Sequence, residues 1–390
     1  MKIVSIFNNK GGVGKTTLMY HLAHILGEMG KKVLILDLDP QCNMSLYGMQ
    51  EKELEKIWQD EDDIIDNGID STKQKMKADG KANDFEDLLK NTRTIHFLLK
   101  SVEEGISDFA ELPPPFKLTN NLDLIPSRLT LFMYENKISE RWSGMFLGES
   151  LSIRTITRIR RIAELYSKER AYDFVIIDTS PNLGALNKVI ISTADGFIVS
   201  CLPDMFSLYG IKNIGQALTQ WQREFKTCFS IISAEKRQEF PQKSVSFLGY
   251  TIYNARKRSS DSRNQWKLAQ AHYNHAQQIP ETIKKHISKE IRVHLTEEMV
   301  VKPIGNDAVM HSHNMLTNMA QKYKQPIWAL PNYPNLEDTD KSTISSNRVD
   351  YENTKNKYQQ LAEDFLKRVE TLDSRFTNEP LQKIAILNNE

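Results

Sequence analysis

The sequence contains few cysteines and no long apolar run. Its three cysteines, Cys42, Cys201 and Cys228, are far apart and form no Cys-x-x-Cys pair, so neither a disulfide framework nor a zinc or iron–sulfur site is indicated. No apolar run reaches the length that a bilayer-spanning helix needs, and the chain begins without a signal-peptide pattern. We therefore expect a cytoplasmic protein with no membrane association.

The chain also lacks a strong charge of either sign, with 51 Lys and Arg against 50 Asp and Glu. Its 390 residues are 40% hydrophobic and 26% charged, a composition typical of a folded globular protein. This length suits one large α/β domain with elaborations or two ordinary domains. The two signs of charge are unevenly distributed along the chain.

Short apolar runs alternate with helical segments. The runs predict buried strands at 2–7, 33–37, 122–125, 174–178, 196–201 and 247–253. Between the first two, Leu22, Ile25, Leu26 and Met29 recur at helical spacing, and Gly30 closes the segment. This order predicts a right-handed βαβ unit within a doubly wound, mostly parallel sheet that has helices on both faces.

Three segments interrupt the alternation. Residues 51–117 are rich in Asp, Glu and Lys and predict a partly helical, acidic surface insertion. Residues 254–302 lean basic, with about twice as many Lys and Arg as Asp and Glu. Residues 331–390 predict a linker and a C-terminal helix that packs through Tyr358, Leu361, Phe365, Val369 and Leu372 on a domain formed by 1–330.

A glycine-rich string follows the first predicted strand and precedes the first predicted helix. It reads Lys10-Gly11-Gly12-Val13-Gly14-Lys15-Thr16-Thr17 and fits the P-loop pattern GxxxxGK[ST]. The glycines let backbone N–H groups wrap around phosphates, Lys15 places a positive charge on the β- and γ-phosphates, and Thr16 offers a hydroxyl to Mg²⁺. We therefore expect residues 11–17 to bind ATP with Mg²⁺.

The additional lysine, Lys10, makes the string resemble the deviant Walker A motif of the ParA/MinD family of ATPases, of the SIMIBI type. It is most similar to the ParA-type (Soj-like) DNA-partitioning proteins. The resemblance implies that Lys10 reaches across a dimer interface to the partner's nucleotide. The string Leu34-Ile35-Leu36-Asp37-Leu38-Asp39-Pro40-Gln41 resembles the family's first switch, which implies that Asp39 orients the attacking water and Asp37 lies near the metal.

Two later segments extend the resemblance. Val175-Ile176-Ile177-Asp178-Thr179-Ser180-Pro181 resembles the Walker B strand and second switch, which implies that Asp178 holds Mg²⁺ through water; Ser180 stands where the family commonly has proline. An asparagine after the late strand contacts the base in relatives, which implies this role for Asn254. Pro303 is expected to complete the base pocket, although Lys302-Pro303-Ile304 departs from the family's Pro-Arg pattern.

The resemblance implies a function as well as a fold. Such ATPases form a homodimer with ATP sandwiched between the subunits and bind DNA without sequence preference. A ParB-like partner stimulates their weak hydrolysis during plasmid or chromosome partitioning. The basic stretch Arg256–Arg292, with Trp266 and Tyr273 interleaved, could contact DNA or could be a solvated face of mixed charge. Arg154, Arg158 and Arg161 share one helix face, for which an ordinary exposed helix is the favoured interpretation.

A P-loop of this kind is compatible with three other functions. A MinD-like membrane-associated ATPase needs a basic amphipathic C-terminal helix, but residues 381–390 carry almost no positive charge. A relative of nitrogenase iron protein needs paired cysteines. A ParA-like switch of a mobile-element or defence operon, with a partner docked on the acidic insertion, stays open. Because the P-loop begins at residue 10, we expect no N-terminal helix-turn-helix and no autorepression.

Overall fold

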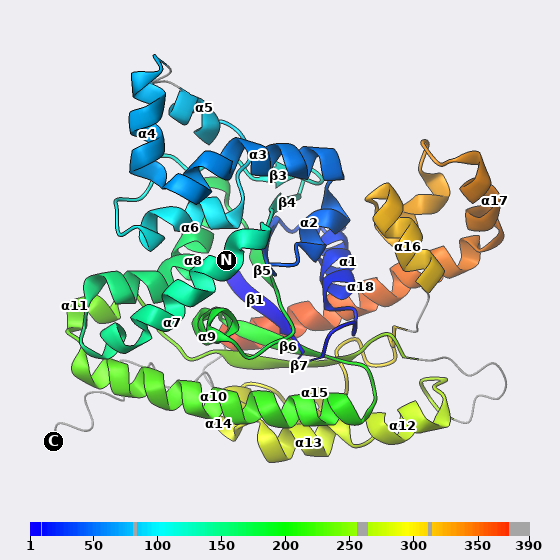
Figure 1. The fold of residues 1–390 in the computed structure, drawn as a ribbon. Helices are drawn as coiled ribbons and strands as arrows, with labels where there is room; N and C mark the ends of the chain where they lie inside the picture. Colours follow the sequence, from blue (N-terminus) through cyan, green and yellow to red (C-terminus); the bar gives the residue numbers. More distant parts are fainter. Residues whose placement is uncertain (9, 81–83, 256–263, 311–313, 374–390) are drawn as a thin grey trace.

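The computed structural model describes residues 1–8, 10–80, 84–255, 264–310 and 314–373. Within them one sheet has the strand order β3-β4-β2-β5-β1-β6-β7 (Figure 1). β3 is antiparallel to β4, and the other neighbouring strands are parallel. The strands are β1 Lys2–Phe7, β2 Val33–Leu38, β3 Phe116–Lys117, β4 Leu122–Ile125, β5 Phe174–Thr179, β6 Gly196–Cys201 and β7 Ser246–Ile252.

The predicted doubly wound sheet is therefore confirmed. Six strands lie within one residue of their predicted limits, and only the two-residue β3 was missed, because two residues show no periodicity. β1 lies between β5 and β6, and β2 pairs with β5 so that Asp37 and Asp178 are in register. The carboxyl ends of β1, β2 and β5, where ligands of parallel sheets bind, consequently meet at one edge.

Helices cover both faces of the sheet (Figure 1). On one face of the sheet, a hydrophobic cluster packs α1 and the C-terminal helix against the strands. On the other face, a second cluster packs α6 through α10 against the strands. The helices of the first half are α1 Lys15–Glu28, α2 Asn43–Gly48, α3 Glu51–Asn67, α4 Ile69–Ala78, α5 Asp84–Leu89, α6 Ile95–Glu103, α7 Phe132–Phe146, α8 Ser150–Arg170 and α9 Ala185–Thr193. Those of the second half are α10 Met205–Ile231, α11 Ala234–Arg237, α12 Gln270–Ala276, α13 Ile279–His286, α14 Lys289–Arg292, α15 Glu297–Val301, α16 Asn314–Tyr323, α17 Asp338–Ser346 and α18 Arg348–Glu370.

The acidic segment 51–117 is only partly a surface insertion. Its helices α3, α4 and α5 stand out from the sheet (Figure 1), but every residue of α6 is buried. The buried carboxylate of Glu61 on α3 accepts hydrogen bonds from the backbone N and Oγ1 of Thr94, the N-cap of α6. The expectation of a surface insertion was therefore wrong for α6, because its apolar side chains complete the core.

The C-terminal helix α18 packs along α1, as the apolar positions predicted (Figure 1). Phe365 lies against Phe174 of β5 with ring centroids 5.6 Å apart. Arg368 is 1% exposed, and its guanidinium donates to Leu248 O at 3.1 Å and Met299 O at 2.6 Å. Residues 374–390 lie outside the described part. In the rest of the chain, no helix is long and apolar enough to cross a membrane.

Candidate nucleotide site

The phosphate loop connects β1 to α1 at the carboxyl edge of the sheet. Gly12 and Gly14 have φ angles of 72° and 79°, a left-handed conformation that glycine adopts without steric cost. Gly14 is the N-cap of α1 and offers no side chain to cap it, so the first N–H groups of α1 are available to an anion. The predicted P-loop thus has the backbone geometry that phosphate binding needs.

Lys15, Thr16 and Asp178 converge beside this loop. Thr16 Oγ1 donates to Asp178 Oδ2 at 2.8 Å. Burial lowers the pKa of Lys15, although the charges of Asp178 and Asp39 act against this shift. Burial raises the pKa of Asp178 to about 6, against the opposing effects of Lys15 and Thr16. A cation, a hydroxyl and a carboxylate therefore share one desolvated space at the start of α1.

This charge distribution fits Mg²⁺ with a nucleotide. Acidic side chains around the loop outnumber basic ones, with Asp37, Asp39, Asp178 and Asp204 near Lys10 and Lys15. A bound triphosphate would add several more negative charges, which a divalent cation offsets. In the described residues, no group of three or more His, Cys, Asp or Glu side chains could hold a metal alone. Thr16 and Asp178 would hold such an ion together with phosphate oxygens, an assignment that stays a prediction.

Asp37 and Asp39 build the turn after β2. The carboxylate of Asp37 is fully buried and accepts from Ser45 N at 2.8 Å, Ser45 Oγ at 2.6 Å and Asp39 N at 3.1 Å. Burial and the charge of Asp178 hold the pKa of Asp37 well above its usual range. Asp39 accepts from Gln41 N at 3.0 Å. Asp37 thus holds this turn through Ser45, and its assignment to the metal stays a prediction.

Lys10 points to α10 and not into its own phosphate cradle. Its ammonium forms an ion pair with Asp204 and lies 5.0 Å from the centroid of the Phe206 ring. Asp204 is also the N-cap of α10 and accepts from Ser207 N at 2.9 Å. Sequence reasoning missed Asp204, although an aspartate just after the strand 196–201 and before a helix is a recognisable N-cap signal.

The second switch loop touches the phosphate loop. A Cβ on Gly11 would lie 3.9 Å from Pro181 Cγ. Asn187 on α9 donates through Nδ2 to Ser180 O and Asn182 O, both at 2.8 Å. The loop that contains Ser180 in place of the family's usual proline is therefore held by Asn187, another residue that sequence reasoning missed.

The two residues predicted to contact the base lie at different levels of β7. Asn254 directly follows Tyr253 at the end of β7 and has a φ of 55°. The segment around Pro303 contacts the middle of this strand, where Ile304 N donates to Tyr250 O at 2.7 Å. A turn follows Pro303, so that Met310 bonds to Ile252 and Ala255 at the carboxyl end of β7. Met310 is thus nearer to Asn254 along the strand, and the base contacts of Asn254 and Pro303 stay predictions.

The structure describes part of the basic stretch 256–292 and the whole arginine face 154–161. Arg256, Lys257, Arg258 and Arg263 lie outside the described residues. Trp266 is 9% exposed and packs edge-on to Tyr273, so its ring belongs to the core and not to a stacking surface. On α8, Arg154 and Arg158 both pair with Asp108, and Arg158 is 2% exposed. Asp108 thus offsets only part of the charge of this face, and Arg161 is exposed and lies 3.7 Å from Glu164.

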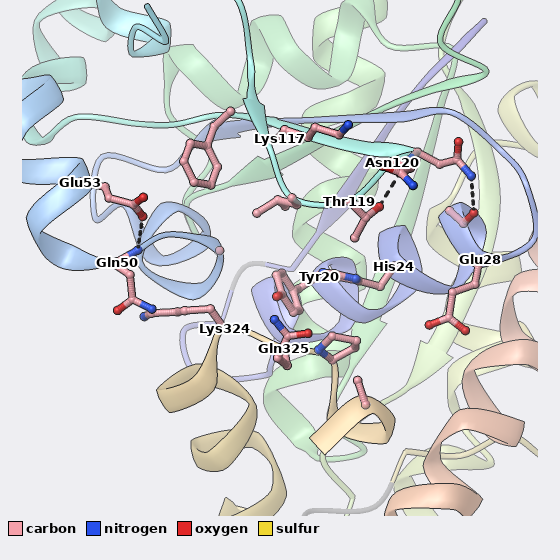
Figure 2. A pocket seen from close by; sticks show the side chains of 17 residues that line it. Tyr20, His24, Glu28, Gln50, Glu53, Lys117, Thr119, Asn120, Lys324 and Gln325 are labelled. Atoms are coloured by element: carbon pink, nitrogen blue, oxygen red, sulfur yellow. Dashed lines mark hydrogen bonds between the residues drawn. The ribbon is translucent and has the colours of Figure 1, made fainter. Parts of the chain in front are cut away.

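A pocket of about 440 Å³ lies at the other end of α1. Figure 2 shows Tyr20 and His24 of α1 between the Lys117–Asn120 segment and Lys324 with Gln325. These residues surround the last turns of α1 and the segment before β4, at the amino edge of the sheet. The pocket is thus separate from the phosphate loop.

Comparison with known proteins agrees with this geometry. The family model AAA_31, an AAA domain, matches residues 1–231. An uncharacterized protein of Methanocaldococcus jannaschii is 31% identical over 54% of this chain and 63% of its own length. The sporulation initiation inhibitor protein Soj of Bacillus subtilis is 26% identical over 58% of this chain and 68% of its own. The chain spans about half the length of two further curated relatives.

Solved structures show the same fold across nearly the whole chain. The structure of pNOB8 ParA superposes with a TM-score of 0.55 and 17% identity, covering 95% of this chain and 98% of that one. The structure of pNOB8 ParA bound to nonspecific DNA gives a TM-score of 0.50 with 18% identity, covering 96% and 99%. The ParA family protein MG470 of Mycoplasma genitalium is 26% identical over 57% of this chain and 66% of its own length. With the family model matching more than half of the chain, these relatives show that the chain belongs to the ParA-type ATPase family.

Proposed function

We propose that this protein is an ATPase that dimerises around Mg-ATP, binds DNA without sequence preference and acts in plasmid or chromosome partitioning. The observation that carries the proposal is the position of Lys10. Its ammonium is held by Asp204 on α10, outside the cradle that contains Lys15 and Asp178. A lysine there is available to the nucleotide of a second subunit, where it would act as an arginine finger does.

The residues of one chain supply the remaining parts of the reaction. Backbone N–H groups of residues 11–17 and the ammonium of Lys15 would hold the phosphates. Thr16 and Asp178 would hold Mg²⁺, which neutralises charge on the phosphates. Asp39, fixed on its turn by Gln41 N and Asp37, would orient the attacking water. Such positioning is sufficient because phosphoryl transfer needs no covalent intermediate on the protein.

Exposed apolar side chains at the carboxyl edge support a dimer. Met205, Phe206 and Tyr209, at the start of α10, are 52%, 60% and 58% exposed. Leu129 and Phe132, which follow β4, are 56% and 53% exposed. Clusters of large exposed apolar residues commonly mark contact surfaces. A second copy facing this edge would cover them and bring its Lys10 to the nucleotide.

Basic residues on α10 and α13 are the described candidates for DNA contact. Burial and then the positive charges of Lys285 and Lys212 lower the pKa of His286, so the two lysines lie near this neutral ring and supply the positive charge of the surface. The two helices lie side by side along one edge of the molecule (Figure 1). The structure of pNOB8 ParA bound to nonspecific DNA supports DNA binding by a protein with this fold. We also propose a ParB-like stimulating partner and a cytoplasmic, nucleoid-associated location.

A salt-titrated binding assay on random duplex DNA tests this function. The protein is measured with ATP, with ADP and without nucleotide, and its mass in solution is recorded under the same conditions. We expect a dimer and salt-sensitive DNA binding with ATP alone, because phosphate contacts release counterions. Binding to anionic vesicles without DNA binding would instead support the membrane-associated alternative. A monomer with ATP would contradict the proposal.

A further inference from the structure

The ring of Tyr253 closes directly on the phosphate loop. Tyr253 follows the last residue of β7, and its side chain is 6% exposed. A Cβ at Gly14 would lie 2.2 Å from Cε1 and 2.6 Å from Cδ1 of this ring, so the ring rests on the Gly14 backbone. Gly14 O accepts the first α1 hydrogen bond, from Leu18 N at 2.8 Å. Tyr253 therefore limits how the loop and the start of α1 can move.

The hydroxyl of Tyr253 connects this contact to the C-terminal helix. It lies 3.1 Å from the hydroxyl of Tyr358 on α18, and the Thr17 side chain is a further hydrogen-bond partner. Tyr253 N donates to Cys201 O at 2.9 Å, which anchors its backbone to β6. Because Tyr358 is 1% exposed, loss of either hydroxyl would leave its partner without a water to replace it.

His21 provides a second connection between the same two parts. Its Nε2 accepts from Ile327 N at 3.1 Å, so Nδ1 bears the proton and donates to Thr17 O at 2.7 Å. Burial lowers the pKa of His21 to about 4, which agrees with this neutral ring. The Tyr358 ring stacks on His21 with centroids 5.0 Å apart, and Trp328 lies 5.5 Å from both rings. Thr17, in the first turn of α1, is thus linked to residues 327–358 by two indirect routes, one through His21 and one through Tyr253.

We propose that Tyr253 is a positioning residue of the nucleotide site and that Tyr358 holds it in place from α18. The C-terminal segment, which lies beyond the residues 1–231 that the family model matches, then forms part of the support of the phosphate loop. ATP binding would therefore change the surroundings of Tyr358 and of the neighbouring Trp328. This inference rests on the proposed binding of ATP at the loop.

A double-mutant cycle on the full chain tests the coupling. Tyr253→Phe and Tyr358→Phe each remove one hydroxyl and keep the ring, and the matched control is Tyr250→Phe. Tyr250 is also buried on β7, but its hydroxyl donates to Val301 O at 2.7 Å. We expect each of the first two variants to bind ATP roughly three- to tenfold more weakly and the double variant to bind no worse than either. The control should bind as the wild type does.

Fluorescence of Trp328 gives a second readout that overall stability does not set. The signal of Trp328 is the difference in fluorescence between the wild type and the Trp328→Phe variant. We expect ATP to change it in the wild type and in Tyr250→Phe, and the change to be lost in Tyr358→Phe at saturating ATP. Wild-type affinity in both phenylalanine variants, or effects that simply add, would overturn the inference while leaving the proposed function intact. No ATP binding by the wild type would instead overturn the proposed function.

Discussion

The Lys10 ammonium is paired with the Asp204 carboxylate, and that same carboxylate caps α10 through Ser207 N. Both side chains are partly exposed, at 32% and 24%, so the pair lies at the rim of the nucleotide site. If Lys10 serves the nucleotide of a second subunit, it has to leave Asp204 when the dimer forms. The ion pair would then oppose dimerisation by its own interaction free energy.

Replacing Asp204 by asparagine should therefore favour the ATP-bound dimer. Asparagine remains a good N-cap, so α10 keeps its start while the charge is removed. A partly exposed pair contributes at most about 1 kcal/mol, so the ATP concentration at half-maximal dimerisation should fall by at most about fivefold. Analytical ultracentrifugation across an ATP titration measures this shift.

The pH dependence of this variant provides its control. Burial raises the pKa of Asp204, but hydrogen bonds from Lys10 and Ser207 and the charge of Lys10 outweigh it, so the pKa lies below its usual value. The pair is therefore intact above the ordinary aspartate pKa of about 4 and is lost only as pH falls through the lowered value. The wild type and Asp204→Asn should differ equally at pH 5 and pH 7. If the wild type and Asp204→Asn dimerise at the same ATP concentration at both pH values, Asp204 does not restrain Lys10.

Mixing two inactive variants tests whether Lys10 acts across the interface. In a dimer of Lys10→Ala with Asp39→Ala, the first subunit keeps its own Asp39 and can receive Lys10 from the second. In an equimolar mixture, half of the dimers contain one subunit of each variant, and each of these dimers has one complete site out of two. About a quarter of the wild-type hydrolysis should therefore return. The measurement is phosphate release after mixing, with each variant alone as the reference. If Lys10 acts within its own subunit, no mixed site is complete and the mixture stays inactive.

The sequence predicted those parts of the site that depend on local pattern. Gly12, Gly14 and Lys15 lie where the P-loop motif puts them, and Asp178 ends a strand whose apolar run was clear. The partners Asp204, Asn187 and Tyr253 come from distant elements that only the tertiary fold brings to the loop. The buried Arg158 on α8 was unpredictable for the same reason, because its partner Asp108 lies far away in sequence.

The two aspartates of the first switch should behave differently when replaced. Asp39→Ala should keep ATP affinity within about twofold, lower hydrolysis by roughly 100-fold or more, and accumulate the dimer, because only water positioning is lost. Asp37→Ala should unfold at lower temperature, because Ser45 N and Oγ lose their buried acceptor. Thermal unfolding and equilibrium ATP binding distinguish the two. An Asp39→Ala protein that no longer binds ATP would refute its assignment to water.

Charge reversal on α10 and α13 should weaken DNA binding. Lys212→Glu with Lys285→Glu should reduce the affinity for random duplex DNA at least tenfold and make the salt slope shallower, because phosphate contacts are lost. Lys284→Glu is the matched control on α13, because Lys284 pairs with Glu297 and Glu281 and contributes less free charge. Filter binding at several salt concentrations measures both. Equal loss in the control would place the DNA surface elsewhere.

The glycines of the phosphate loop offer a test with an internal comparison. Gly12 and Gly14 both have positive φ, but a Cβ at Gly12 meets no atom within 4 Å, whereas one at Gly14 overlaps the Tyr253 ring. Gly12→Ala should therefore cost only the backbone strain, about 1–2 kcal/mol of unfolding free energy. Gly14→Ala adds a steric clash and should abolish measurable ATP binding. Combining Gly14→Ala with Tyr253→Ala removes the overlapping ring and should restore part of the lost unfolding free energy, as measured by urea denaturation. Equal effects of the two single substitutions would show that strain alone acts at Gly14, and that the ring of Tyr253 does not constrain the loop.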